Sequence, residues 1–217
     1  MPRFLDKLFV WTFRIRTLGS RLRSQDSRAF RGSQSYWQQR YAAGDNSGAG
    51  SHGRLAIFKA EVINRFIQER QVASVIEFGC GDGRQLELSA YPRYLGYDVS
   101  ETAIARCRMR FAADPTKEFR LIKDYAGETA EVAISLDVIY HLVEDEVFEK
   151  HMSTLFGAAE RHVIIYSTNS DFNPWYTVAH VRNREFTRWV ASRAPQWRLT
   201  ATRPGYEAEF FFYERIQ

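Results

Sequence analysis

Apolar residues gather in short runs that alternate with amphipathic stretches along most of the chain. Two of these runs, Val132-Ala-Ile-Ser-Leu and His162-Val-Ile-Ile-Tyr, are almost continuously apolar. Such runs are typical of parallel strands that are buried on both faces. Between the runs, apolar residues recur at helical spacing. From Val72 onward the pattern predicts strands at about 73–78, 94–98, 119–123, 131–137 and 161–168, and helices at about 84–90, 101–112 and 144–159.

The flanking segments extend this pattern. A helix before the first strand is predicted by a stripe of apolar residues at helical spacing, namely Leu55, Phe58, Val62 and Phe66. Toward the C-terminus we expect a helix at about 184–193 and two strands, 197–203 and 207–216, on either side of Pro204-Gly205. A hairpin of this kind closes one edge of a parallel sheet. The sequence therefore predicts an α/β domain with helices on both faces of a mostly parallel sheet.

Length and composition fit one large domain with an appendage. The chain has 217 residues, of which 45% are hydrophobic and 15% aromatic, which is enough to build a core. No run reaches the ~18 apolar residues that a membrane-spanning helix needs. Two cysteines, Cys80 and Cys107, do not suggest a disulfide framework, so we expect a reducing, cytoplasmic compartment.

The positive charge is concentrated at the N-terminus. Residues 1–35 carry eight Arg or Lys against two acidic residues, whereas the remainder is slightly acidic. This distribution argues against a nucleic-acid-binding face on the main domain, so we do not expect nucleic acid as a partner. We divide the chain into a basic arm and linker over residues 1–35, with the linker at 19–35, and a folded domain over residues 36–217.

The arm itself is amphipathic. Among its basic residues stand Phe4, Leu5, Leu8, Phe9, Trp11, Phe13 and Ile15. One hypothesis is a peripheral contact of residues 1–31 with an anionic membrane surface. The alternatives are a helix docked on its own domain and a tail without fixed structure.

One loop carries the clearest chemical signal. Residues 75–83 read Val-Ile-Glu-Phe-Gly-Cys-Gly-Asp-Gly, so an acid and three glycines stand at alternate positions. These residues are Glu77, Gly79, Gly81 and Gly83, with Cys80 between the first two glycines. Glycine has no Cβ and tolerates positive φ, so the backbone can turn sharply beneath a flat ligand. A second apolar run then ends in Asp98, and this order of strand, glycine loop, helix, strand and acid holds an adenosine group.

The glycine spacing distinguishes between two adenosine ligands. A dinucleotide loop reads Gly-x-Gly-x-x-Gly/Ala, and here Arg84 stands at the third of these positions. Glycines two apart, with an acid two residues upstream, resemble motif I of the class I S-adenosylmethionine-dependent methyltransferases. Their ligand has no pyrophosphate, so the loop need not present a helix N-terminus to phosphate.

The resemblance covers about residues 36–216. It includes the segments Tyr36-Trp-Gln-Gln-Arg-Tyr, Ser47-Gly-Ala-Gly-Ser-His-Gly-Arg-Leu-Ala-Ile-Phe-Lys, Ser135-Leu-Asp-Val-Ile-Tyr-His-Leu-Val-Glu-Asp and Ile165-Tyr-Ser-Thr-Asn. Together these are similar to a group of small bacterial class I methyltransferases, some of them associated with glycan biosynthesis. The resemblance implies a Rossmann-like fold whose mostly parallel sheet has seven strands and an antiparallel C-terminal edge hairpin. It also implies S-adenosyl-L-methionine as the methyl donor.

The resemblance further implies donor-binding roles. Asp98, followed by Val99, should accept hydrogen bonds from the ribose hydroxyls, and Asp124 should accept from the adenine amino group with Tyr125 beside the ring. Asp137 should lie near the sulfonium or the methionine amine. Closure over the methionine end is expected from Tyr36, Arg40, Tyr41 and a lid at 47–53 whose glycines act as hinges. The alternatives are a solvated acid at 124 and an ordinary linker at 47–53.

Two histidines are candidates for the acceptor side. Methyl transfer to a hydroxyl requires alignment of the reactants and removal of one proton. His141, beside Asp137 in the expected catalytic wall, is the candidate base, and its alternative is a packing role. His180 lies in a segment, 179–184, whose two arginines suit an anionic or polyhydroxylated acceptor, and the alternative there is a solvated helix entry. We assign no metal site.

The leading hypothesis is a methyltransferase for a small-molecule or glycan-like acceptor, acting at oxygen rather than nitrogen. It would be cytoplasmic, and membrane-associated if the arm binds lipid. The alternatives are a nucleic-acid or protein methyltransferase recruited by the arm, an inactive donor-binding partner subunit, and a nicotinamide oxidoreductase. Asn173-Pro-Trp-Tyr176 resembles the base-gripping motif of adenine amino-methyltransferases, but it follows the fifth predicted strand and lacks a second proline. We interpret it as a turn.

Overall fold

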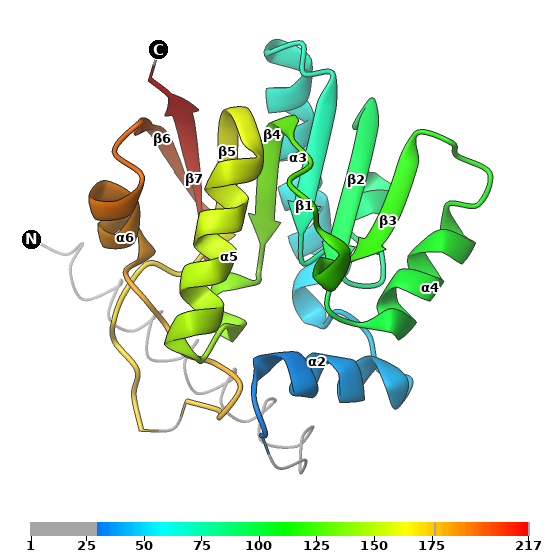
Figure 1. The fold of residues 1–217 in the computed structure, drawn as a ribbon, viewed down its shortest axis with the longest axis horizontal. Helices are drawn as coiled ribbons and strands as arrows, with labels where there is room; N and C mark the ends of the chain where they lie inside the picture. The colour runs from blue at the N-terminus through cyan, green and yellow to red at the C-terminus, as the bar shows by residue number, and fades with distance from the viewer. Residues whose placement is uncertain (1–29, 176, 217) are drawn as a thin grey trace, which may run out of the picture.

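Seven strands form one sheet with the order β3-β2-β1-β4-β5-β7-β6 in a computed structural model that describes residues 30–175 and 177–216 (Figure 1). The strands are β1 Ser74–Phe78, β2 Arg93–Asp98, β3 Lys117–Leu121, β4 Ala130–Leu136, β5 Ala159–Ser167, β6 Trp197–Pro204 and β7 Glu209–Arg215. The first five pair in parallel, and β7 runs antiparallel to both β5 and β6. The predicted seven-stranded sheet with an antiparallel edge hairpin is confirmed.

Helices cover both faces of this sheet. They are α2 Ser33–Ala42, α3 Gly53–Glu69, α4 Glu101–Arg110, α5 Asp145–Ala158 and α6 Phe186–Arg193. Because side chains alternate along a strand, Val132 and Ile134 of β4 face one layer while Ala133 between them faces the other.

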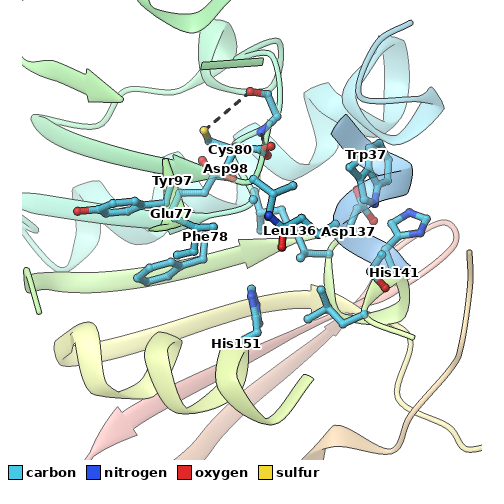
Figure 2. A pocket seen from close by; sticks show the side chains of 18 of the residues that line it. Trp37, Glu77, Phe78, Cys80, Tyr97, Asp98, Leu136, Asp137, His141 and His151 are labelled. Carbon is cyan, nitrogen blue, oxygen red and sulfur yellow. Dashed lines mark hydrogen bonds between the residues drawn. The ribbon is translucent and has the colours of Figure 1, made fainter. Parts of the chain in front are cut away.

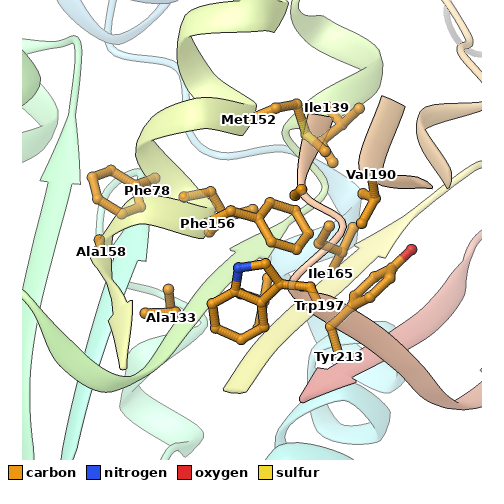
Figure 3. Close-up of a cluster of buried hydrophobic side chains, with 14 of the residues drawn as sticks. Phe78, Ala133, Ile139, Met152, Phe156, Ala158, Ile165, Val190, Trp197 and Tyr213 are labelled. Atoms are coloured by element: carbon orange, nitrogen blue, oxygen red, sulfur yellow. The ribbon is translucent and has the colours of Figure 1, made fainter. Parts of the chain in front are cut away.

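Each layer has its own apolar cluster. Ile63 of α3 and Ile104 of α4 belong to the cluster that includes Val132. On the opposite face, Met152 and Phe156 of α5 lie with Val190 of α6 against Ala133 and Ile165 (Figure 3). Burial of these side chains at about 25 cal/mol per Å² of apolar surface is the main stabilising contribution to the sheet and its two helical layers.

The segment after the glycine loop differs from the prediction. Instead of a helix over 84–90, the chain makes a single 3-10 turn at Leu86–Leu88. Gly83 before the turn has a φ of +78°, and Ser89 after it is extended with a φ of −102° and a ψ of 138°, so the helical conformation does not propagate on either side. Gln85 holds the turn against α3 by donating to the carbonyl of Ala56 at 3.0 Å.

Two further points concern the N-terminal side. Helix α2 begins at Ser33, so residues 33–35 of the expected linker are helical. The arm over residues 1–29 lies outside the described ranges, and its membrane contact stays a prediction. Within the ranges that are described, none of the helices combines the length and apolarity needed to cross a bilayer.

The carboxyl edge of the sheet is where a ligand is expected. Strand order reverses between β1 and β4, and such a switch point opens a crevice beyond the carboxyl ends of the strands. Helix α2 lies across this edge in Figure 1. The fold therefore encloses the crevice between the strand ends and α2.

Candidate functional site

A cavity of about 540 Å³ lies at the carboxyl ends of β1, β2 and β4 (Figure 2). Such a volume is in the range of small-molecule sites. The predicted site residues that line it are Tyr41, Glu77, Gly79, Cys80, Gly81, Asp98, Val99, Tyr125, Asp137 and His141. The cavity thus brings together residues from five separate stretches of the chain.

The glycine loop forms one wall of the cavity. Gly79 has a φ of +93°, and a Cβ there would lie 2.3 Å from Cγ2 of Val138. Gly81 has a φ of +56°, and its Cβ would lie 2.7 Å from the hydroxyls of Tyr41 and Ser47. Both positions therefore require glycine for conformation and for space. Gly83, by contrast, packs beside Cys107 of α4 and is not among the cavity-lining residues.

Asp98 fixes this loop to the end of β2. Its Oδ2 accepts the Gly81 N–H at 2.9 Å, and its Oδ1 accepts the Ser100 N–H at 2.9 Å. Burial raises the pKa of Asp98 to about 6, against the lowering effect of these backbone hydrogen bonds. Each carboxylate oxygen has a second lone pair, so Asp98 can still accept from a ligand hydroxyl in the cavity.

Glu77, the next-to-last residue of β1, is also buried. Its Oε2 accepts the hydroxyl of Tyr94 at 2.5 Å. Burial raises the pKa of Glu77 to about 7, opposed by the Tyr94 hydrogen bond and by the charge of Lys59. The carboxyl group therefore changes protonation near neutral pH.

Asp137 follows β4 in a left-handed conformation with a φ of +59°. Its N–H donates to the carbonyl of Tyr166 at 2.9 Å, which holds the strained backbone in place. Its Oδ2 pairs with Nζ of Lys59, and its Oδ1 accepts the hydroxyl of Tyr140 at 3.0 Å. With both oxygens engaged, Asp137 is an anchored carboxylate at the cavity wall.

Helix α2 and the loop after it form the roof. The Tyr41 hydroxyl donates to Ser47 Oγ at 3.2 Å, and Ser47 donates to Asp82 at 2.5 Å. A Cβ on Gly50 would lie 2.7 Å from Asp137 Oδ2, so the loop directly covers that carboxylate. Ser47 and Ser51 of the expected lid and Trp37 of α2 line the cavity.

The remaining two residues expected to close over the donor brace this roof. Nη1 of Arg40 lies 3.3 Å from the Tyr36 hydroxyl, and Nε of Arg40 donates to the carbonyl of Asn46 at 3.0 Å. Neither Tyr36 nor Arg40 is among the lining residues of the cavity.

His141 is held in one orientation at the cavity wall. Its Nδ1 lies 3.0 Å from the carbonyl oxygen of His180, which can only accept, so Nδ1 carries the proton. Burial lowers the pKa of His141 to about 4. The neutral ring therefore has its lone pair on Nε2, and it lies edge-on to Trp37 with 4.9 Å between centroids.

His180 contacts His141 through its carbonyl oxygen, and the two rings are stacked with 5.6 Å between centroids. Its ring stacks on Tyr36 at 4.2 Å and an interplanar angle of 10°, and it is not a lining residue of the cavity. Nearby, Arg182 and Arg184 pair with Asp145 at 3.0 and 2.6 Å. Both arginines also donate to the carbonyl of Val143, so they brace the start of α5.

Of the two residues predicted to contact the adenine of the donor, Tyr125 lines the cavity and Asp124 does not. The Tyr125 ring lines the cavity and lies edge-on to Phe78 at 5.5 Å. Asp124 is exposed in a 3-10 turn and is absent from the lining. Its neighbours Ile122 and Lys123 line the cavity instead.

Sequence reasoning did not identify several further lining residues, and three of them carry polar side chains of chemical interest. Lys59, Trp37 and His151 all face the cavity. Nε2 of His151 lies 3.0 Å from Ser135 Oγ, and burial lowers the pKa of this histidine to about 4. A signal existed for Lys59, which is a lone cation within the apolar run Leu-Ala-Ile-Phe-Lys-Ala. Over residues 30–175 and 177–216, no group of three or more His, Cys, Asp or Glu side chains is arranged to hold a metal ion.

Comparison with known proteins gives matches in structure only. No protein-family model matches the chain, and no curated protein is significantly similar to it in sequence. Among solved structures, the N-methyltransferase NodS from Bradyrhizobium japonicum WM9 in complex with S-adenosyl-L-homocysteine is similar with a TM-score of 0.68 and 12% identity. That match covers 86% of this chain and 100% of NodS.

Two further structures show the same similarity. Magnesium protoporphyrin IX methyltransferase from Synechocystis PCC 6803, with bound S-adenosyl-L-homocysteine, gives a TM-score of 0.59 at 16% identity over 73% of this chain and 83% of that enzyme. The methyltransferase domain of bacterial CtHen1 gives 0.60 at 16% identity over 74% of this chain and 98% of that domain. These are different methyltransferases, and each is at most 16% identical to this chain in sequence. What they share with the chain is therefore the fold. The chain has the fold of the class I S-adenosylmethionine-dependent methyltransferases.

Proposed function

We propose that this chain is an S-adenosylmethionine-dependent methyltransferase that acts on a small-molecule or glycan-like acceptor at oxygen. The observation that carries the proposal is Asp98, a buried carboxylate that is joined to the glycine loop at Gly81 inside a roofed cavity. Adjacent ribose hydroxyls are two donors, and a carboxylate offers them two acceptors.

The cavity residues fit this donor in shape and in chemistry. The loop at Gly79 and Gly81 leaves no room for a Cβ, so backbone alone faces the ligand there. Val99 and Tyr125 supply apolar and aromatic surface next to Asp98 for a flat base. When bound, the donor supplies an electrophilic methyl group on a sulfonium. Asp98 would hold the ribose, and the α2 roof would exclude water.

His141 supports an oxygen acceptor. Its Nε2 carries a lone pair at neutral pH and can accept the proton of an acceptor hydroxyl. Its Nδ1–H is bound to the carbonyl of His180, so the ring cannot turn to present the other nitrogen. His180 would act as a positioning residue behind this base. Asp137, whose oxygens are already bound to Lys59 and Tyr140, would provide negative charge near the sulfonium.

Donor binding is the direct test. We expect wild-type protein to bind S-adenosylhomocysteine in isothermal calorimetry. Asp98→Asn should weaken binding by at least about tenfold, because a hydrogen bond to a charged group contributes about 1.5–3 kcal/mol. The matched control is Asp114→Asn, which alters a surface aspartate whose side chain is 43% exposed and accepts from Thr116.

Two results would contradict the proposal. One is no binding by folded wild-type protein, and the other is undiminished binding by Asp98→Asn. If binding holds, incubation of cell extract with labelled donor and protein, followed by mass identification of the product, names the acceptor. Label on a carboxylate or on nitrogen would contradict the hydroxyl acceptor while leaving the donor assignment intact.

A further inference from the structure

We propose that the segment between β5 and α6 docks on an anionic membrane surface, with Phe172 and Trp175 inserted at the interface, and that it acts together with the basic N-terminal arm. The segment, called here the β5–α6 segment, is described over residues 168–175 and 177–185. The inference concerns a partner of the chain, so the docking does not depend on methyl transfer.

Two large aromatic side chains of this segment are exposed. Trp175 is 88% exposed and Phe172 is 59% exposed, and within the described ranges Trp175 is the most exposed of the large apolar residues. Exposed apolar residues that stand singly are ordinary, but these two aromatic residues are three positions apart on one loop. Such a local concentration indicates a surface that a partner covers.

The exposure does not come from a loosely held loop. The Asn183 N–H donates to Asn173 Oδ1 at 2.6 Å, and Asn173 Nδ2 donates back to the Asn183 carbonyl at 2.9 Å. The side-chain amide of Asn183 also donates to the carbonyl of Phe172 at 3.1 Å. Asp171 Oδ1 accepts the Glu185 N–H at 2.8 Å. The two ends of the loop are therefore joined by hydrogen bonds, and its aromatic side chains are left on the outside.

The segment lies where the N-terminal arm enters the domain. The ring of Phe30 is 6.3 Å from that of Tyr36, which stacks on His180 of the segment at 4.2 Å. In Figure 1 the segment extends below α5 toward α2. Residues 1–35 carry eight Arg or Lys against two acidic residues, together with the apolar side chains of the amphipathic arm. A partner that contacts both the arm and the loop must be apolar and anionic, as an anionic lipid surface is.

The charges of the segment do not oppose an anionic surface. With the first turn of α6, it holds three arginines and two acidic residues, which gives a net charge of +1. Its acidic residues Asp171 and Glu185 both pair with Arg188, at 3.2 and 2.6 Å. Asp145 at the start of α5 pairs with Arg182 at 3.0 Å. The strong positive charge of the arm is therefore not cancelled beside the loop, and anionic lipids would attract it.

Two side chains are too few to hold a protein partner. A stable protein interface buries about 800 Å² on each partner, whereas a large aromatic side chain supplies about 150–250 Å². At a lipid interface the same pair is an adequate anchor, because a tryptophan ring is favoured at the level of the headgroups and basic residues add electrostatic attraction. A lipid surface therefore fits the loop better than a second protein does.

The cavity opens near this surface. Exposed side chains of α2 and α5 line it, namely Gln34, Glu146, Val147 and Lys150. Both helices contact the β5–α6 segment, α2 through Tyr36 and α5 through Asp145. Docking would thus bring the opening close to the bilayer, within reach of an acceptor that is carried on a lipid. This consequence, unlike the docking itself, rests on the proposed function.

Vesicle flotation with the full chain tests the docking. We expect wild-type protein to bind vesicles of equimolar phosphatidylcholine and phosphatidylglycerol at least about tenfold more tightly than vesicles of phosphatidylcholine alone. The double variant Phe172→Ser with Trp175→Ser should bind the mixed vesicles at least about tenfold more weakly, because both aromatic anchors are lost. The matched control is Met109→Ser on α4, where the side chain is 76% exposed, and it should bind as wild type does.

Fluorescence quenching distinguishes insertion of the loop from binding by the arm alone. In Trp11→Phe, which removes the tryptophan of the arm, brominated phosphatidylcholine in the mixed vesicles should quench the remaining emission. The further change Trp175→Phe should abolish most of this quenching, because the other tryptophans are at least partly buried in the domain. No quenching in Trp11→Phe, with a serine double variant that binds as tightly as wild type, would leave only the arm on the membrane and overturn the inference.

Two other results would also overturn it. One is folded wild-type protein that floats with neither kind of vesicle. The other is a wild-type dimer in sedimentation velocity that becomes a monomer in the serine double variant, since the surface would then belong to a second copy of the chain. Both positions are exposed, so circular dichroism should show the variant folded, and it should bind S-adenosylhomocysteine as wild type does. If neither protein binds S-adenosylhomocysteine, the proposed function is rejected and the vesicle result still stands.

Discussion

His141 shows how burial and a single hydrogen bond can set the chemistry of one side chain. Burial lowers its pKa to about 4, and the bond to the carbonyl of His180 puts the proton on Nδ1. A base with this pKa is unprotonated throughout the physiological range, but it binds a proton only weakly. Its contribution is therefore to align the acceptor hydroxyl by accepting its hydrogen bond, and to take up the proton only as the oxygen becomes acidic during methyl transfer.

This state of His141 is directly measurable. In long-range ¹H–¹⁵N spectra of labelled protein, we expect His141 to show the Nδ1-protonated tautomer at pH 7 and to titrate near pH 4, and His151 should also titrate near pH 4. Loss of that signal in His141→Asn assigns it to His141. The asparagine amide can still donate to the carbonyl of His180, so the substitution keeps this contact. A midpoint near the ordinary value of about 6.5, or protonation at Nε2, would contradict the assignment.

Lys59 shows where sequence reasoning about residues ends. The apolar stripe Leu55, Phe58, Val62 and Phe66 predicted the helix correctly, and a lysine within such a helix is ordinarily solvated. Its burial depends on Asp137, which is 78 residues away in sequence. The position of Asp137 after a predicted strand indicates that it faces the cavity. No nearby sequence pattern predicts which cation pairs with it.

At the scale of elements, α2 is held over the cavity at both ends. The Ser33 N–H and hydroxyl donate to the Glu144 carboxylate at 2.8 and 2.5 Å. At the other end, Arg106 of α4 donates to the carbonyls of Tyr41 and Asp45. Although burial opposes it, the hydrogen bonds from Ser33 hold the pKa of Glu144 below its usual value.

Weakening the first contact should loosen the roof. Glu144→Gln keeps the volume but leaves one oxygen to accept, so α2 should lose about 1–3 kcal/mol of docking free energy. We expect faster amide exchange across α2 and faster release of S-adenosylhomocysteine, with little change in global stability. The control is Glu149→Gln, in α5 just after Glu144, whose carboxylate accepts from Trp189 instead. Unchanged exchange in α2 would show that this contact does not hold the roof.

The elements were predictable to the extent that their signals are local. Strands such as β4 and β5 are predicted by continuous apolar runs in the sequence. Asp98 is predicted by its position at the end of the apolar run that forms β2. The helix expected at 84–90 is only a 3-10 turn, because the chain becomes extended at Ser89. The roof role of α2 was expected only in part, since it depends on the contact of Ser33 with Glu144, 111 residues away.

For the whole molecule, the buried carboxyl at the centre of the sheet links stability to pH. Burial raises the pKa of Glu77 to about 7 from an ordinary 4.5. Between these values the folded chain keeps a proton that the unfolded chain releases. The stabilising contribution is thus complete below pH 4.5 and is lost as pH rises through 7. His141 and His151, with lowered pKa values, act with the opposite sign as pH falls from 6.5 to about 4.

Comparison with Glu77→Gln isolates this contribution, because all other groups cancel in the difference. The amide can still accept from the Tyr94 hydroxyl. Relative to wild type, the variant's free energy of unfolding should increase by about 3 kcal/mol between pH 4.5 and 7 and then level off. Urea unfolding at a series of pH values measures it, with Glu61→Gln at an exposed position on α3 expected to follow the wild-type curve. A difference that does not change with pH would mean that Glu77 is already ionised in the folded protein at pH 5, stabilised by Lys59 more strongly than burial opposes it.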